Sequence, residues 1–397
     1  MQLPPLRIKK NYDENIRRGF PWAYAGDIID SSELTLLPAG SLVSVENFKG
    51  EYIGVGYYNS RSQISCRLLA LGRVDIDVEF FATRIKAALT KREKIITVPY
   101  YRLIHSEADD LSGLLIDRFG DAVVVQIGTA GMEKLLPMII DALEMVLQPK
   151  AIVLRNDNSA RKLEGLTQEV RVIKGEAGQS VEVLENDCVY LADLIHGQKT
   201  GWFYDQRDNR KMIADLSHGK TVADIYSHSG GFGLLAAKSG ANSVTLVDSS
   251  ALALDMAQKA AVKNNVTVEC VKGDAFAVIE NFAKAGKKFD IVLADPPAFV
   301  KSKKDIASGL KGYEKVARLC APLVAENGLL FMASCSHHAG RSAFNKAVLD
   351  GVRKAGFTAE ILKQTGAAPD HPRHKLLLQS EYLKGILLRV HSRLIKI

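Results

Sequence analysis

The sequence predicts an α/β protein in which residues 188–397 form a parallel sheet with helices on both faces. Two observations predict this fold. Short apolar runs alternate with helix-like runs throughout this half of the chain, and such alternation is typical of a parallel sheet. A glycine-rich turn at 227–233 (SHSGGFG) separates the first apolar run from a helix-like run. In sheets of this kind, ligands bind beyond the carboxyl ends of the strands.

Length and composition limit the alternatives. A chain of 397 residues suits two or three domains, and its 47% hydrophobic content is ample for packed cores. A net charge of +7 permits a polyanionic partner such as RNA without requiring one. Five scattered cysteines without a CxxC pair argue against a disulfide framework and favour a reducing cytosol. We find neither a signal-peptide pattern nor an apolar run of ~18 residues, so we expect a cytoplasmic protein without a membrane partner.

Residues 1–73 predict a β-rich domain. Two strands, SLVSVENF and EYIGVGYY, are joined by Lys49-Gly50, which indicates a hairpin. Arginines and aromatic residues lie on either side of this hairpin. Arginines grip phosphates and rings stack on bases, so the pattern suits RNA. Alternatively, Trp22 and Tyr24 belong to the core and the arginines are solvated. The residues we assign to RNA here are Arg17, Arg18, Trp22, Arg61 and Arg67.

Residues 76–187 predict a small α+β domain that carries no obvious chemistry, and it would serve as a spacer or an RNA platform. Its expected elements are an amphipathic helix over 75–95, strands at 113–121 and 122–127, a helix over 134–147, and strands at 152–155 and 181–184.

The C-terminal half then alternates regularly. We expect strands at 221–225, 243–247, 267–271, 289–294, 329–334 and 386–390, with helices at 251–264, from 275, at 305–326 and at 343–355. Asn327-Gly328 would end the third of these helices, since glycine often follows a helix C-terminus.

The glycine turn suits a nucleoside ligand, because glycine lets the backbone approach closely. Asp248, about 20 residues beyond the turn, is placed to hold a ribose diol. The turn has neither the GxGxxG nor the GxxxxGK[ST] spacing, which argues against NAD and ATP. Adenosine without pyrophosphate fits better, and S-adenosylmethionine is the common example. The alternative is a turn that binds nothing.

Chemistry-bearing residues follow four consecutive strands: Asp248, Asp274, Asp295 in DPPAF, and Cys335 in SCSHH. The carboxyl ends of parallel strands share one sheet edge, so these residues should converge on one crevice. Asp274 is suited to accept from an adenine amine and equally to cap the following helix.

These motifs, with Asp224–Gly233, resemble those of class I S-adenosylmethionine-dependent methyltransferases. The run GQKTGWFYDQRDNR at 197–210 is similar to large-subunit rRNA cytosine-5 methyltransferases that carry an N-terminal PUA domain, and RRGFPWAYAGDI resembles that domain. DHP at 370–372 and YLKG at 382–385 match as well. The resemblance covers nearly the whole chain and implies a Rossmann-like methyltransferase domain after a PUA-like domain.

The resemblance implies S-adenosylmethionine as the cofactor and large-subunit rRNA as the partner, and it leaves homodimer formation open. Asp295 would hold the target base and Cys335 would be the nucleophile. Arg207, Lys301 and Lys303 would contact RNA, although a solvated basic loop explains the lysines equally well. The residues expected at the cofactor are Phe203, Asp205, Ser229, Gly230, Gly231, Gly233, Asp248, Ser249, Asp274, Ala275 and Asp295.

A cysteine suits this chemistry because carbon 5 of cytosine is a poor nucleophile. A thiolate that adds to carbon 6 turns the ring into an enamine, which can attack a methylsulfonium. The target base must leave its stack to reach the crevice. We interpret Cys66, Cys188, Cys270 and Cys320 as structural.

Three points stay open. Ala298 stands where many RNA cytosine-5 methyltransferases have a second cysteine, so the proton acceptor is unidentified; His337 and His338 are candidates. DPPAF also resembles the (D/N)PP(Y/F) motif of enzymes that methylate base nitrogens. A non-catalytic RNA-binding assembly factor is the third alternative. The histidine and cysteine spacing matches no standard metal site, so we predict no metal.

Overall fold

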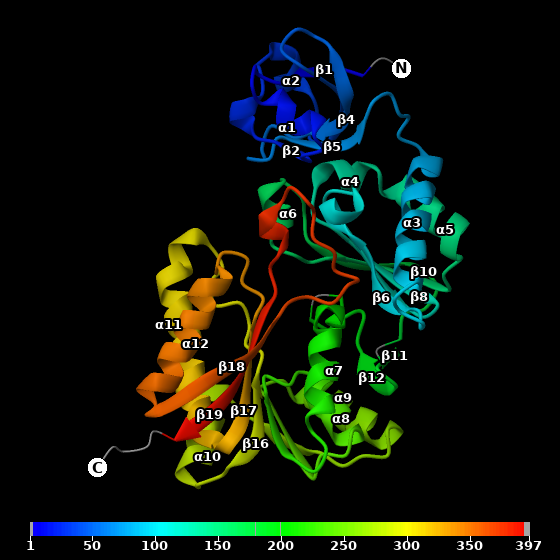
Figure 1. The fold of residues 1–397 in the computed structure, drawn as a ribbon. Coiled ribbons are helices and arrows are strands. Elements are labelled where there is room, and N and C mark those ends of the chain that lie inside the picture. Colours follow the sequence, from blue (N-terminus) through cyan, green and yellow to red (C-terminus); the bar gives the residue numbers. More distant parts are fainter. Residues whose placement is uncertain (1–2, 179, 199, 393–397) are drawn as a thin grey trace. The chain divides into compact units, whose positions relative to one another are not determined.

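A computed structural model describes residues 3–178, 180–198 and 200–392, which form two compact units (Figure 1). Unit 1 comprises the chain up to Val181 together with Asp193–Tyr204 and Pro369–Leu378. Unit 2 comprises Glu182–Ala192, Asp205–Ala368 and the chain from Gln379 onward. Within the described residues, no helix has the length and apolar character needed to cross a membrane.

The first part of unit 1 is a five-stranded sheet in the order β1-β3-β4-β5-β2. The predicted hairpin is confirmed, because β3 and β4 pair antiparallel and Gly50 between them has a φ of +85°. The strands are β1 (Pro5–Arg7), β2 (Trp22–Ala23), β3 (Ser41–Glu46), β4 (Tyr52–Tyr58) and β5 (Cys66–Leu71), with helices α1 (Asp13–Arg17) and α2 (Ser32–Leu36).

The second part of unit 1 is a sheet in the order β10-β9-β8-β7-β6, against which α3 and α5 pack. It shares its core with the first sheet. The Tyr57 ring covers Gly131 so closely that a Cβ there would lie 2.1 Å from the ring. This shared core explains why residues 1–73 and 76–181 lie in one compact unit, whereas residues 182–187 of the predicted middle domain belong to unit 2. The elements are α3 (Val78–Glu93), β6 (Tyr100–His105), β7 (Leu114–Phe119), β8 (Ala122–Ile127), α4 (Ala130–Lys134), α5 (Leu136–Leu147), β9 (Ala151–Asn156), α6 (Ala160–Leu163) and β10 (Glu169–Lys174).

Unit 2 contains a seven-stranded sheet in the order β15-β14-β13-β16-β17-β19-β18. The first five strands of that order run parallel, whereas β19 runs antiparallel to both β17 and β18. The strands are β13 (Thr221–Ile225), β14 (Ser243–Asp248), β15 (Glu269–Lys272), β16 (Phe289–Ala294), β17 (Val324–Ser334), β18 (Phe357–Thr365) and β19 (Lys384–Ser392); β11 (Val181–Glu185) and β12 (Cys188–Ala192) pair separately.

Helices cover both faces of this sheet (Figure 1). On one face, α7 (Arg207–Asp215), α8 (Gly231–Lys238) and α9 (Ala251–Lys263) contribute to a buried cluster with Val222 and Leu293. On the other, α10 (Ala275–Lys284), α11 (Ile306–Cys320) and α12 (Arg341–Lys354) bury residues against Val292 and Met332. The predicted doubly covered α/β sheet is confirmed.

One predicted helix extends too far, and one edge strand of this sheet was not predicted. The helix expected over 305–326 ends at Cys320, and a 3₁₀ turn leads directly into β17 at Val324. Pro322 lies in that turn and cannot donate a backbone hydrogen bond, so the helix cannot continue. We also missed β18, an edge strand whose residues are all partly or fully exposed, so its sequence lacks a buried apolar face.

Candidate active site

The glycine turn connects β13 to α8 through unusual backbone conformations. Tyr226 and His228 have φ values of 64° and 49°, and Gly230 has a φ of 80°. Asp224, at the end of β13, accepts a hydrogen bond at Oδ2 from the Gly233 amide at 2.9 Å. Burial raises the pKa of Asp224 to about 7, and the charges of Asp295 and Asp248 act in the same direction. Asp224 therefore stabilises the conformation of the turn through this hydrogen bond, a role that we did not assign from the sequence.

Two of the three glycines of the turn are required by packing inside the protein. A Cβ at Gly231 would lie 2.7 Å from Arg210 Nε, and one at Gly233 would lie 2.2 Å from Leu246 Cδ2. Gly230 is the one that needs a left-handed backbone. The contact of the three glycines with a cofactor stays a prediction. Ser229 is buried, and its hydroxyl shares a hydrogen bond with His228 Nδ1 at 3.2 Å; its contact with the cofactor stays a prediction as well.

Asp248 ends β14 beside this turn. Its Oδ2 accepts from the His228 amide and its Oδ1 from the Ser250 amide, both at 2.8 Å. Each carboxylate oxygen has a second lone pair, so the fixed carboxylate can still accept from a ribose diol. Ser249 is exposed beside it.

Asp274 caps α10, because its Oδ1 accepts from the Ala277 amide at 3.1 Å. The capping alternative therefore holds, and Ala275 is the buried first residue of the helix. A contact of either residue with adenine stays a prediction.

Asp295 follows β16 and is held by a relay of side chains from α7 and the turn before it. Gln206 Nε2 donates to Asp295 Oδ2 at 2.8 Å, and Asn209 Nδ2 donates to Gln206 Oε1 at 2.5 Å. Asp205 accepts from the Tyr382 hydroxyl at 2.6 Å. We missed Gln206 and Asn209, although both stand in the 197–210 run that we used only for its resemblance. Phe203 belongs to unit 1, and its contact with the cofactor stays a prediction.

Cys335 follows β17, the strand that pairs in parallel with β16, so it lies at the same sheet edge as Asp295. Its side chain is partly exposed. The serines on either side are anchored to Tyr313 on α11: Ser334 Oγ donates to the Tyr313 hydroxyl, and Ser336 Oγ shares a hydrogen bond with it, each at 2.8 Å. The Val300 amide, just beyond DPPAF, donates to Ser336 Oγ at 3.1 Å. The DPPAF and SCS segments are therefore locked together.

The residues of unit 1 that we assigned to RNA differ in exposure. Arg17, Arg18 and Arg61 are exposed. Trp22 is half-buried, and its Nε1 donates to Glu107 at 3.0 Å. Arg67 is mostly buried and forms an ion pair with Glu164 at 2.8 Å, which argues against a contact with RNA.

The assigned residues of unit 2 differ in the same way. Lys301 and Lys303 are exposed beyond DPPAF, as a contact with RNA requires. Arg207 is only 7% exposed and faces Glu185 at 3.6 Å. We correct the expectation for Arg207, because a buried guanidinium beside a buried carboxylate serves the packing of α7.

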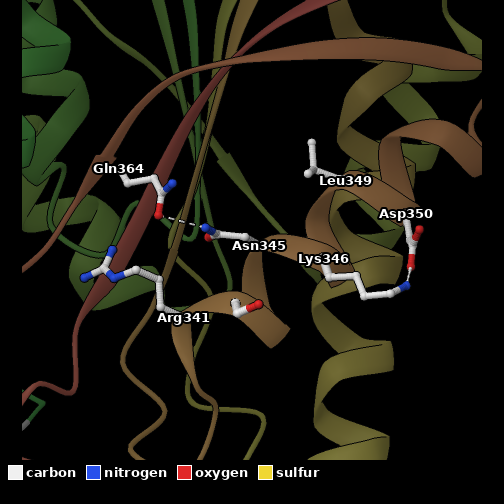
Figure 2. A pocket seen from close by; sticks show the side chains of 7 residues that line it. Arg341, Asn345, Lys346, Leu349, Asp350 and Gln364 are labelled. Atoms are coloured by element: carbon white, nitrogen blue, oxygen red, sulfur yellow. Dashed lines mark hydrogen bonds and ion pairs between the residues drawn. The ribbon is translucent and has the colours of Figure 1, made fainter. Parts of the chain in front are cut away.

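Figure 2 shows a separate hollow between α12 and β18, which contains none of these predicted residues. Two pairs of its polar groups bond to each other: Asn345 donates to Gln364 at 3.0 Å, and Lys346 bonds to Asp350 at 2.5 Å. We assign no ligand to it.

Comparisons with known proteins identify the family of this chain. Residues 6–71 match the PUA-like domain family, and residues 164–348 match the S-adenosylmethionine-dependent methyltransferase family. The ribosomal RNA large subunit methyltransferase I of Aeromonas salmonicida is 34% identical over 394 residues, which cover 97% of this chain and 98% of that protein. The chain belongs to the ribosomal RNA large subunit methyltransferase I family.

Solved structures show the same fold. A protein named as a SAM-dependent methyltransferase from Streptococcus mutans is 22% identical, with a TM-score of 0.82 over 98% of this chain and 100% of its own. A second structure, of a methyltransferase complexed with SAH, has the same identity and coverage and a TM-score of 0.83.

S-adenosylmethionine is the cofactor of this methyltransferase. The residues fit a cationic nucleoside. Besides burial, the charges of Asp295 and Asp248 raise the pKa of Asp224 and the charge of Arg210 lowers it, so three carboxyl groups lie near one another at this edge, where they would attract a sulfonium. The buried Ser227 hydroxyl has no hydrogen-bond partner within the described part of the chain, although buried polar groups normally have one.

Proposed function

We propose that this methyltransferase transfers a methyl group to carbon 5 of a cytosine in large-subunit rRNA through a covalent adduct with Cys335. The observation that carries the proposal is the place of Cys335: partly exposed, directly after β17, at the edge where β16 presents Asp295. The name of the Aeromonas relative supports the RNA substrate.

The chain's residues have distinct tasks in this reaction. The Cys335 thiolate forms a bond from Sγ to carbon 6, which makes carbon 5 nucleophilic toward the methyl group that S-adenosylmethionine supplies on its sulfonium. A base then takes the proton from carbon 5, and the electron pair of that C–H bond expels the thiolate from carbon 6. Asp295 would bind the nitrogen edge of the pyrimidine, and Gln206 orients it by holding Oδ2.

One observation disfavours base nitrogen methylation through DPPAF. That reaction needs the aromatic residue of the motif to stack on the target base. Here the Phe299 ring packs against Tyr313, with ring centroids 4.9 Å apart, and a Cβ at Gly312 would lie 2.8 Å from it. Phe299 therefore packs against α11.

The test uses rRNA substituted with 5-fluorocytidine, whose carbon 5 carries no removable proton. We expect the wild type to form a covalent adduct that survives denaturing electrophoresis, and Cys335→Ala to form none. Cys270→Ala, which removes another partly exposed cysteine of unit 2, is the matched control and should form the adduct. Methyl transfer by Cys335→Ala would support nitrogen methylation. Failure of the wild type to bind S-adenosylmethionine in calorimetry would support an assembly factor without catalysis.

A further inference from the structure

Lys384 places a buried cation beside the cysteine loop. It is the first residue of β19, where it pairs with Ser334 at the end of β17, and only 2% of it is exposed. Its ammonium donates to the backbone carbonyl of Ser336 at 2.6 Å. The cation is therefore bound to the residue that directly follows Cys335.

A buried ammonium normally has a carboxylate partner, because the desolvation of an isolated charge is costly. Among the residues that the structure describes, none forms an ion pair with Lys384. Glu381, a carboxylate whose charge it senses, is paired with Arg341 at 2.7 Å. An ammonium has three donors, and the Ser336 carbonyl uses one. The position therefore favours another negative group nearby.

Cys335 is the group whose charge most favours the Lys384 ammonium. Burial lowers the pKa of Lys384 to about 8, and the charge on Cys335 acts in the opposite direction by favouring the ammonium. The interaction is mutual, so the ammonium equally favours the thiolate. Other charged or titratable side chains around this loop include Tyr313, Arg341, Glu381, His338 and His337, whose ring stacks on Tyr382 with centroids 5.1 Å apart.

We propose that Lys384 is the positioning residue that holds Cys335 as a reactive thiolate. The inference rests on the proposed function and names the group that activates its nucleophile. The support has a defined pH range. Below about pH 8 Lys384 is an ammonium and stabilises the thiolate; as pH rises through that value the amine becomes neutral and the support is lost.

The test measures iodoacetamide alkylation of the full-length chain against pH, with each cysteine followed by peptide mass spectrometry. We expect an apparent pKa for Cys335 below the ordinary thiol value of about 8.5. Lys384→Met removes the cation and should slow alkylation of Cys335 at pH 7 roughly tenfold, since a nearby opposite charge shifts a pKa by about one unit or more. Lys384→Arg retains a cation and should stay near the wild-type rate.

Two other cysteines serve as internal controls. Cys270 is partly exposed elsewhere in unit 2, and its alkylation should not change. Cys320 is fully buried, so its alkylation would report unfolding of a variant. A wild-type pKa for Cys335 at or above about 8.5 overturns the inference without any variant, and so does an unchanged profile in folded Lys384→Met.

The inference and the proposed function fail separately. A fluorocytidine adduct combined with an unperturbed Cys335 thiol refutes the role of Lys384 alone. A lowered thiol pKa that Lys384→Met raises, without any adduct, refutes the proposed reaction alone.

Discussion

Replacing Asp224 by asparagine should change how the stability of this protein depends on pH. The Asp224 carboxyl is buried beneath the glycine turn, and its Oδ2 accepts from the Gly233 amide. Asparagine is nearly isosteric and its Oδ1 can accept the same hydrogen bond, so the turn should keep its geometry. The substitution therefore removes the titratable carboxyl at position 224 and keeps the hydrogen bond from the Gly233 amide.

The magnitude follows from the pKa of this carboxyl, which is 3.8 in a model compound and about 7 in the folded protein. Because the folded pKa is raised, the folded state holds the proton more tightly, and ionisation destabilises it progressively from about pH 4 to about pH 7. One pKa unit corresponds to about 1.4 kcal/mol. Between pH 5 and pH 8, Asp224 should lower the free energy of unfolding by about 2 to 3 kcal/mol.

The assay is urea unfolding at pH 5 and pH 8 without S-adenosylmethionine. The wild type should lose about 2 to 3 kcal/mol more than Asp224→Asn between the two pH values. Asp255→Asn, at an exposed position on α9, makes the same change in net charge and should retain the wild-type dependence. If Asp224→Asn loses as much stability as the wild type, the carboxyl does not titrate in this range.

Three further predictions concern packing and charge. Gly233→Ala should lower the free energy of unfolding by about 1 to 3 kcal/mol in urea titration, since its Cβ would lie 2.2 Å from Leu246 Cδ2; an unchanged midpoint would contradict the packing. Glu185→Gln removes the carboxylate that faces Arg210 at 2.7 Å and should cost about 3 to 5 kcal/mol, seen as a lower Tm. Lys301→Gln should reduce the slope of log RNA affinity against log salt by nearly one; an equal slope would mean that Lys301 contacts no phosphate.

Much of the unit 2 sheet could be predicted because its central strands are apolar on both faces. The bounds predicted for β13 and β16 agree with the structure residue for residue. The start of β17 could not be found by periodicity, since Val324 continues an apolar run that begins in α11, and only Pro322 marked the break.

Those parts of the candidate active site that follow from the order of the strands could be predicted from the sequence. Residues after parallel strands share one edge, and so Asp248, Asp295 and Cys335 could be placed together. The support for Asp295 comes from Gln206, 89 positions earlier in the chain, and local patterns contain no information about such a pairing. Arg67 and Arg207 were assigned to RNA because sequence alone does not separate a solvated arginine from one buried beside a glutamate.

The place of β19 has a consequence for biosynthesis. This strand is made after every other strand of its sheet, yet it lies inside the sheet between β17 and β18. A nascent chain that has emerged only as far as β18 leaves one side of β17 open, and an exposed strand edge can pair with another chain. The elongating polypeptide therefore passes through an aggregation-prone stage, at which a chaperone that covers this gap would raise the yield of native enzyme.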